Sequence, residues 1–145
     1  KIIDQNYKSP ETLIRYLVSA AGKGANLLLN VGPQPNGEIP AAALERMEVM
    51  GEWLQTYGET VYGTEAGDVK QQQWGCTTRH GEKLYVHIFE LEDEMLYLPL
   101  ECKVTDAKVF VSGEPVKVER VAKGVVLNLG KIPQGVDYVV ELTTK

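Results

Sequence analysis

The chain has 145 residues, of which 43% are hydrophobic and 24% are charged, and its formal net charge is −5 at pH 7. This composition is typical of a globular protein and not of a disordered one. No stretch is strongly basic, which argues against nucleic acid or an anionic membrane surface as a partner, and the apolar runs are too short to span a bilayer.

The first predicted helix covers residues 10–22. Ser9 has the side chain of an N-cap, Pro10 suits the first helical position, and Glu11 is favoured there by the helix dipole. Apolar residues recur at helical spacing and share one face: Leu13, Ile14, Leu17, Val18 and Ala21. The glycines that follow can end the helix in a left-handed conformation.

A short buried strand is predicted at residues 27–31, from Leu27 to Val31. It is apolar on both faces, as is typical of a strand inside a parallel sheet with both sides covered. The turn at Gly32-Pro33 ends it. No second strand of this type lies nearby, so we expect the first third of the chain to be part of something larger. The opening at Lys1 without an initiator Met fits a fragment or a processed chain.

The second predicted helix covers residues 40–57. Its inward stripe is expected to consist of Leu44, Met47, Gly51 and Leu54, widened by Met50 and Trp53. Gly58 can end this helix.

From Gln72 onward the hydrophobic period changes from helical to two. Seven short strands are expected, at residues 74–78, 83–90, 95–100, 108–112, 116–121, 125–129 and 138–143. Short strands separated by turns predict an antiparallel sandwich. The chain is therefore divided into residues 1–66 and residues 67–145.

Histidine and cysteine provide few candidates for chemistry. His87 lies inside a predicted strand and is expected to be a hydrogen-bonded or half-exposed structural residue, whereas His80 lies in a turn and is expected to be solvated. Cys76 and Cys102 are too few for a disulfide framework and lack metal-ligand spacing, so they are predicted to be two buried thiols. No metal ligand and no cofactor is predicted.

Four motifs in the first half carry a family resemblance. They are Tyr7-Lys8-Ser9-Pro10-Glu11 with Asn26-Leu27-Leu28-Leu29-Asn30-Val31-Gly32-Pro33, then Gly37-Glu38-Ile39-Pro40, Gly51-Glu52-Trp53-Leu54, and Tyr57-Gly58-Glu59-Thr60-Val61-Tyr62-Gly63-Thr64. In order and spacing they resemble the end of the catalytic domain of α-L-fucosidases, glycoside hydrolase family 29. The resemblance implies an α+β chain, formed by the last helix-strand-helix of a (β/α)8 barrel and an antiparallel β-sandwich of about seven strands. Residues 67–145 resemble the family's C-terminal sandwich in pattern only.

The resemblance also implies an activity for the parent protein. It is a retaining exo-hydrolase that removes terminal α-L-fucose from glycans with two carboxylates, one as nucleophile and one as acid/base. The family's motifs that carry the nucleophile and the acid/base are not found in this sequence. No catalytic residue is therefore assigned, and the chain alone is expected to be inactive. The implied partners are fucosylated glycans through the parent enzyme, and the implied location is secreted, periplasmic or lysosomal.

Asn30 is the one candidate for substrate binding. It would lie at the C-terminal end of the presumed eighth barrel strand, where barrel sites are located. If the side of the strand that carries Asn26, Leu28 and Asn30 faces the barrel interior, Asn30 borders the fucose site. Alternatively, its side chain satisfies backbone groups at the end of the strand.

Two further functions stay open for the sandwich. One is a non-catalytic carbohydrate-binding or interaction module, which would need exposed aromatic side chains on one face. The other is purely structural support of the barrel's last helix, which we favour for residues 67–145. The lone strand from Leu27 to Val31 needs neighbours, so we expect the remainder of the barrel or another copy of the chain to pair with it.

Overall fold

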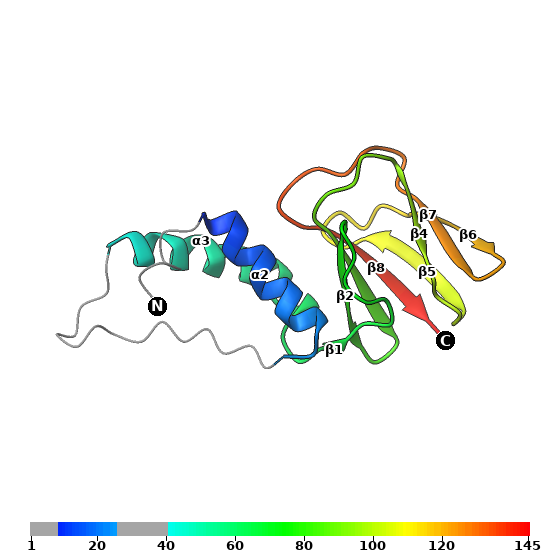
Figure 1. The fold of residues 1–145 in the computed structure, drawn as a ribbon, viewed down its shortest axis with the longest axis horizontal. Coiled ribbons are helices and arrows are strands. Elements are labelled where there is room, and N and C mark those ends of the chain that lie inside the picture. Colours follow the sequence, from blue (N-terminus) through cyan, green and yellow to red (C-terminus); the bar gives the residue numbers. More distant parts are fainter. Residues whose placement is uncertain (1–8, 26–40) are drawn as a thin grey trace.

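The computed structural model describes residues 9–25 and 41–145 (Figure 1). Two helices, α2 (Pro10–Gly22) and α3 (Ala41–Tyr57), precede the short 3-10 helix η1 (Gly58–Thr60). The strands of the described residues are β1 (Glu65–Ala66), β2 (Gly75–His80), β3 (Lys83–Ile88), β4 (Met95–Leu98), β5 (Val104–Val109), β6 (Lys117–Val121), β7 (Gly124–Asn128) and β8 (Tyr138–Thr144). No helix among these residues is long and apolar enough to cross a membrane.

The strands form two antiparallel sheets. One sheet has the order β1-β2-β3-β8-β5, and the other has the order β4-β7-β6. Between the sheets lies the larger apolar core, which includes Leu84, Val86, Ile88, Leu96, Leu98, Val125, Leu127, Val140 and Leu142. The predicted α+β class is therefore confirmed, with antiparallel strands after the helices.

The five-stranded sheet is covered on its second face by the helices, as Figure 1 shows for α2 beside β2. A second cluster of buried residues joins the two layers: Ile14, Leu17, Val18, Ala21, Met50, Trp53, Val61 and Cys76. Strand β3 is consequently buried on both faces. Leu84 and Val86 pack into the sandwich core, whereas Tyr85 and His87 alternate with them and point to the other face of the sheet.

Helix α2 begins as the sequence predicts. The Ser9 hydroxyl accepts a hydrogen bond from the amide of Thr12 at 3.1 Å, and Pro10 is the first helical residue. Its predicted apolar face is confirmed, with Ile14, Leu17, Val18 and Ala21 buried. After the helix, Gly24 has a φ of 79°, which a residue with a side chain rarely adopts.

The predicted inward stripe of α3 is wrong in part. Met47 is 39% exposed and Gly51 is also exposed, whereas Met50 and Trp53 are buried. The reason is that α3 packs on α2 and the sheet through the face of Met50, Trp53 and Tyr57. The side chain of Leu44 lies outside the described part of the chain.

Six of the seven predicted strands overlap closely with the observed ones, and β5 is displaced. It covers Val104–Val109, whereas the sequence pattern predicts residues 108–112. Strand β5 is an edge strand with a register shift between Val104 and Asp106, which leaves Thr105 as an extra residue. The exposed polar residues at this edge interrupt the alternation from which a strand is predicted. The short strand β1 was not predicted, and it pairs with β2 at Ala66 and Thr78.

Candidate functional site

Asn30, the predicted substrate-binding residue, lies outside the residues that the structure describes, as does the predicted strand from Leu27 to Val31. Its role therefore stays a prediction. The described residues of the helices and the two sheets form several polar clusters and hollows.

A chain of buried polar groups lies where the helices meet the five-stranded sheet. His87 on β3 has its Nδ1 2.8 Å from Oδ2 of Asp137 and its Nε2 2.9 Å from Oγ1 of Thr78. The Thr78 hydroxyl donates to the carbonyl of Thr60 in η1 at 2.6 Å. The side chains of His87 and Asp137 are fully buried. His87 is thus a hydrogen-bonded structural residue, but it is not half-exposed.

This Thr-His-Asp arrangement uses the same residue types as a nucleophilic triad, but its environment differs. A nucleophilic hydroxyl must reach a substrate and give its proton to the histidine. Thr78 is fully buried, and its proton is directed to the backbone carbonyl of Thr60. The arrangement therefore connects structural layers and is not suited to acyl or glycosyl transfer.

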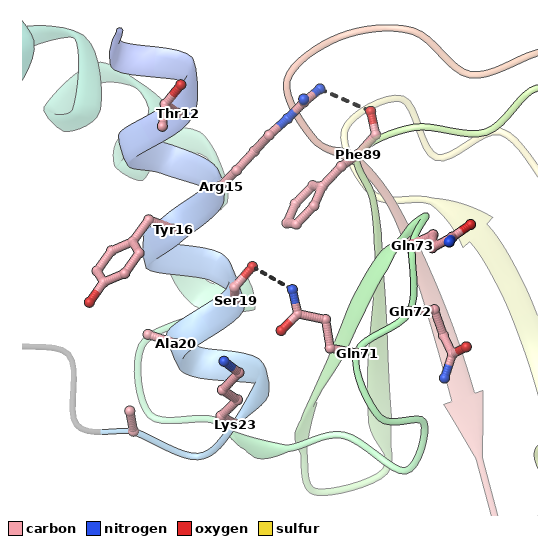
Figure 2. A pocket seen from close by; sticks show the side chains of 11 residues that line it. Thr12, Arg15, Tyr16, Ser19, Ala20, Lys23, Gln71, Gln72, Gln73 and Phe89 are labelled. Carbon is pink, nitrogen blue, oxygen red and sulfur yellow. Dashed lines mark hydrogen bonds between the residues drawn. The ribbon is translucent and has the colours of Figure 1, made fainter. Parts of the chain in front are cut away.

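Arg15 connects α2 to two loops of the sandwich, one that follows β3 and one that precedes β8. Its guanidinium donates to the carbonyls of Val136 at 2.8 Å and Phe89 at 2.9 Å, and it lies 5.5 Å from the centroid of the Phe89 ring. Figure 2 shows Arg15 reaching from α2 to Phe89. Nothing in the sequence pattern of residues 10–22 indicates this role of Arg15, because its acceptors are backbone atoms far along the chain.

A groove of about 530 Å³ lies between α2 and the segment before β2 (Figure 2). Gln71 spans it, with its amide 3.4 Å from the Ser19 hydroxyl. The lining consists of Thr12, Arg15, Tyr16, Ser19, Ala20, Lys23, Ala25, Gln71, Gln72, Gln73 and Phe89. These side chains can form hydrogen bonds, and no carboxylate is found among the described residues of the lining.

Carboxylates gather at a neighbouring hollow of about 360 Å³. Glu11 and Glu90 lie 4.0 Å and 3.8 Å from the guanidinium of Arg15, and their side chains are 59% and 78% exposed. A glycosidase acid is typically a shielded carboxyl group, kept protonated by its environment. These two carboxylates are solvated and share one cation, so we assign them no catalytic role.

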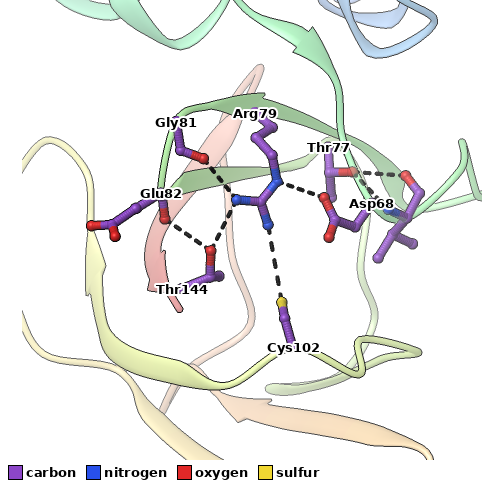
Figure 3. A network of polar contacts seen from close by, with 8 residues as sticks. Asp68, Thr77, Arg79, Gly81, Glu82, Cys102 and Thr144 are labelled. Carbon is purple, nitrogen blue, oxygen red and sulfur yellow. Dashed lines mark hydrogen bonds and ion pairs between the residues drawn. The ribbon is translucent and has the colours of Figure 1, made fainter.

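A second polar network joins β2 to the end of the chain (Figure 3). Arg79 donates to Asp68 at 2.6 Å, and it also contacts the carbonyl of Gly81 and the hydroxyl of Thr144, each at 2.9 Å. The hydrogen bond to Asp68 raises the pKa of Arg79. These donors are directed at protein acceptors, and the network therefore links β2 to neighbouring segments at this end of the sandwich.

The two cysteines are free thiols in different environments. Cys76 is buried, and burial is the main cause that raises its pKa to about 12. Cys102 is half-buried, so the prediction of two buried thiols is correct for Cys76 only. Within residues 9–25 and 41–145, no group of three or more His, Cys, Asp or Glu side chains is arranged to hold a metal ion.

The outer face of the three-stranded sheet carries one exposed aromatic ring. Tyr97 on β4 is 47% exposed, and its hydroxyl donates to the carbonyl of Lys123 at 3.1 Å. The same face has a hollow of about 440 Å³, lined by Met95, Lys117, Val118, Glu119, Val126 and Asn128. The other aromatic residues of the second half are buried or half-buried: Trp74, Tyr85, Phe89, Phe110 and Tyr138.

The comparisons with known proteins find similarity to α-L-fucosidases. The family model described as Alpha-L-fucosidase matches residues 1–59. The alpha-L-fucosidase of Dictyostelium discoideum is 30% identical over 146 residues, which cover 92% of this chain and 31% of that protein. The chain therefore spans about a third of the length of this relative.

Solved structures agree in fold as well as in sequence. Alpha-L-fucosidase isoenzyme 1 from Paenibacillus thiaminolyticus superimposes with a TM-score of 0.80 at 31% identity, over 96% of this chain and 35% of that one. A GH29 alpha-L-fucosidase from Bacteroides thetaiotaomicron gives a TM-score of 0.83 at 27% identity, over 95% of this chain and 33% of that one. By sequence and by fold, the chain is thus homologous to a portion, about a third, of the α-L-fucosidases of glycoside hydrolase family 29.

Proposed function

We propose that the chain is the C-terminal portion of a retaining exo-α-L-fucosidase, in which it supports the catalytic barrel without supplying the nucleophile or the acid/base. The observation that carries the proposal is the likeness to fucosidase structures over 96% of the chain, which takes in the helices and the sandwich together. In this proposal the substrates are fucosylated glycans, and both catalytic carboxylates come from other parts of the parent enzyme.

In this proposal the two parts of the chain have different roles, which the contacts between helices and sheet support. Residues 1–66 complete the end of a (β/α)8 barrel, and residues 67–145 form the sandwich on which α2 and α3 rest. Arg15 and the bond from Thr78 to Thr60 fix the helices to the sheet. A sandwich attached in this way limits the movement of the barrel's last helices.

The length of the natural protein tests this proposal. Intact mass and N-terminal sequencing of the protein purified from its source should find this chain at the end of a polypeptide about three times as long. A natural protein that consists of these 145 residues alone would refute the proposal.

The strand from Leu27 to Val31 gives the proposal a second test. In the parent enzyme it pairs with neighbouring barrel strands, and Asn30 at its end faces the fucose site. In the isolated chain this strand either pairs with another copy, so that light scattering shows association that increases with concentration, or abandons barrel geometry and packs elsewhere. A monomer at all concentrations, with a Leu28→Asp variant that is equally stable, would contradict the assigned burial of this strand.

A carbohydrate-binding module is the second candidate, and the exposed ring of Tyr97 favours it. The ring lies beside Gly124, where an added Cβ would be 2.9 Å from the Tyr97 Cε1, and its hydroxyl is held by Lys123. A ring held in place loses little entropy on binding, and the hollow beside it carries both donors and acceptors: Lys117, Glu119 and Asn128.

Titration with 2′-fucosyllactose, followed by amide NMR, distinguishes this candidate from a purely structural sandwich. A module should show shifts confined to β4, β6 and β7, with a Kd on the order of 1 mM, and Tyr97→Ala should abolish them. Tyr62→Ala is the matched control, because Tyr62 is 45% exposed and lies outside these strands. Absence of shifts, or equal shifts in Tyr97→Ala, would exclude the module.

A further inference from the structure

The hydrogen-bond partners of Thr78 determine where its proton lies. Its Oγ1 is 2.6 Å from the carbonyl oxygen of Thr60 and 2.9 Å from Nε2 of His87. A carbonyl oxygen can only accept, and a hydroxyl has a single hydrogen to donate. Thr78 therefore donates to Thr60, and Nε2 of His87 must carry a hydrogen that it donates to Thr78.

The other ring nitrogen of His87 requires a second hydrogen. Its Nδ1 lies 2.8 Å from Oδ2 of Asp137, and both side chains are fully buried. At this distance a hydrogen must lie between the two atoms, because two lone pairs would repel each other. The pair thus holds one proton more than a neutral imidazole and a carboxylate hold between them.

We propose that His87 and Asp137 are an imidazolium–carboxylate pair in the folded chain, and that this buried proton holds the helices to the sheet. The pair is connected to both helices. Through Thr78 it reaches Thr60, the last residue of η1, which follows α3 directly. Asp137 follows Val136, whose carbonyl accepts a hydrogen bond from Arg15 on α2. Loss of the proton would leave a buried acceptor without its donor at this joint.

The titratable groups around the pair stay in one state over the pH range of interest. Burial, followed by the charge of Asp137, raises the pKa of Cys76 on β2 to about 12 and also raises the pKa of Tyr57 on α3. Both groups are therefore neutral when a free histidine titrates. The nearby cations are Lys23, which directly follows α2 and whose charge acts on Cys76, and Arg15 on α2, which is bound to backbone carbonyls.

The sign of the pH effect follows from the proton count. In the unfolded chain a free histidine loses its proton above roughly pH 6.5. Because the folded pair keeps its proton, the unfolded state binds fewer protons in this range, and stability falls as pH rises. The unfolding equilibrium constant should increase by up to about tenfold per pH unit above that point. Below it both states hold the proton, and the contribution is fully present.

Nitrogen NMR of the histidine rings tests the protonation directly. The chain has two histidines, and His80 is exposed at the end of β2, so it serves as an internal reference. At a pH where His80 is neutral, both ring nitrogens of His87 should still carry hydrogens. A His87 ring with an unprotonated Nε2 or Nδ1 at that pH would overturn the proposal.

Unfolding at a series of pH values tests the consequence for stability. Between roughly pH 6.5 and 8.5, below the range where free cysteine ionises, His87→Gln and Asp137→Asn should each lose the dependence described above. His80→Gln should retain it. An unchanged slope in both variants of the pair would also overturn the proposal, and if neither variant folds, the NMR result on the unmodified chain decides.

Discussion

Gly22, in the last turn of α2, touches Cys76 on β2. A Cβ added at position 22 would lie 2.9 Å from the Cys76 sulfur and 3.0 Å from its Cβ. This contact sets how closely the helix approaches the sheet, and the absence of a side chain at Gly22 is what permits it.

The variant Gly22→Ala should therefore be less stable than the parent chain, by about 1–3 kcal/mol, because the helix has to move away from β2. The matched control is Gly51→Ala in α3, where an added Cβ meets nothing within 4 Å. There the higher helix propensity of alanine should stabilise the chain by about 1 kcal/mol. Urea unfolding of both variants provides the measurement, and a stabilising Gly22→Ala would show that the two layers do not pack as described.

Removal of the Arg15 guanidinium should loosen α2 from the sandwich. Arg15→Leu leaves the carbonyls of Val136 and Phe89 without this donor, so we expect a loss of about 1–3 kcal/mol in the free energy of unfolding. Glu11→Gln is the control. Glu11 is exposed and its carboxylate is as far as 4.0 Å from the Arg15 guanidinium, so this substitution should change the free energy of unfolding by less than about 0.5 kcal/mol. Equal effects of the two substitutions would contradict the role of Arg15 in holding α2 to the sandwich.

Thr77 offers a test of buried hydrogen bonding with nearly constant shape. Its hydroxyl accepts from the amide of Val69 at 3.1 Å and donates to the carbonyl of the same residue at 2.7 Å. Thr77→Val removes both bonds and should cost about 1–3 kcal/mol. Thr77→Ser keeps the hydroxyl and should cost less. If the serine variant were the less stable one in thermal unfolding, the methyl group and not the hydroxyl would be the important part.

The two thiols should differ in reactivity in the folded chain. Cys76 is 1% exposed and its pKa is raised to about 12, so almost no thiolate is available to an alkylating reagent near neutral pH. Cys102 is half-buried and should react first. Mass spectrometry after timed iodoacetamide treatment measures the order, and denaturant should make the two rates similar. Faster labelling of Cys76 in the folded chain would show that the layers separate.

The same pKa also predicts a loss of stability at alkaline pH. Cys76 is protonated in the folded chain up to about pH 12, whereas an unfolded cysteine ionises from roughly pH 8.5. The folded state then binds more protons, and stability falls as pH rises through this window. Comparison with Cys76→Ala in urea unfolding isolates this contribution, because the variant should lack it.

Local patterns were sufficient to predict most of the elements. The cap at Ser9, the helical face of Ile14 and Leu17, and the strand at residues 83–90, observed as β3, are encoded by neighbouring residues, and each was predicted correctly. The edge strand β5 was misplaced, because Thr105 is an extra residue opposite β8 and its neighbours are exposed and polar. The inward face of α3 was misjudged because the helix is apolar on more than one side.

The polar contacts between layers could not be read from the sequence. Asp137 is 50 residues from His87, and no local spacing connects them. Arg15 binds backbone carbonyls more than 70 residues away, and any residue type can provide these. Such contacts depend on how the sheet and the helices come together, and only the three-dimensional structure shows them.

The central claim is that this chain supports an α-L-fucosidase and holds no catalytic pair of its own. The release of nitrophenol from a nitrophenyl α-L-fucoside by the purified chain tests it most directly, with the full-length parent enzyme as the positive control. We predict no turnover above the buffer rate for the chain and clear turnover for the parent. Turnover by the chain itself, which persists through repeated purification and scales with its concentration, would contradict the claim.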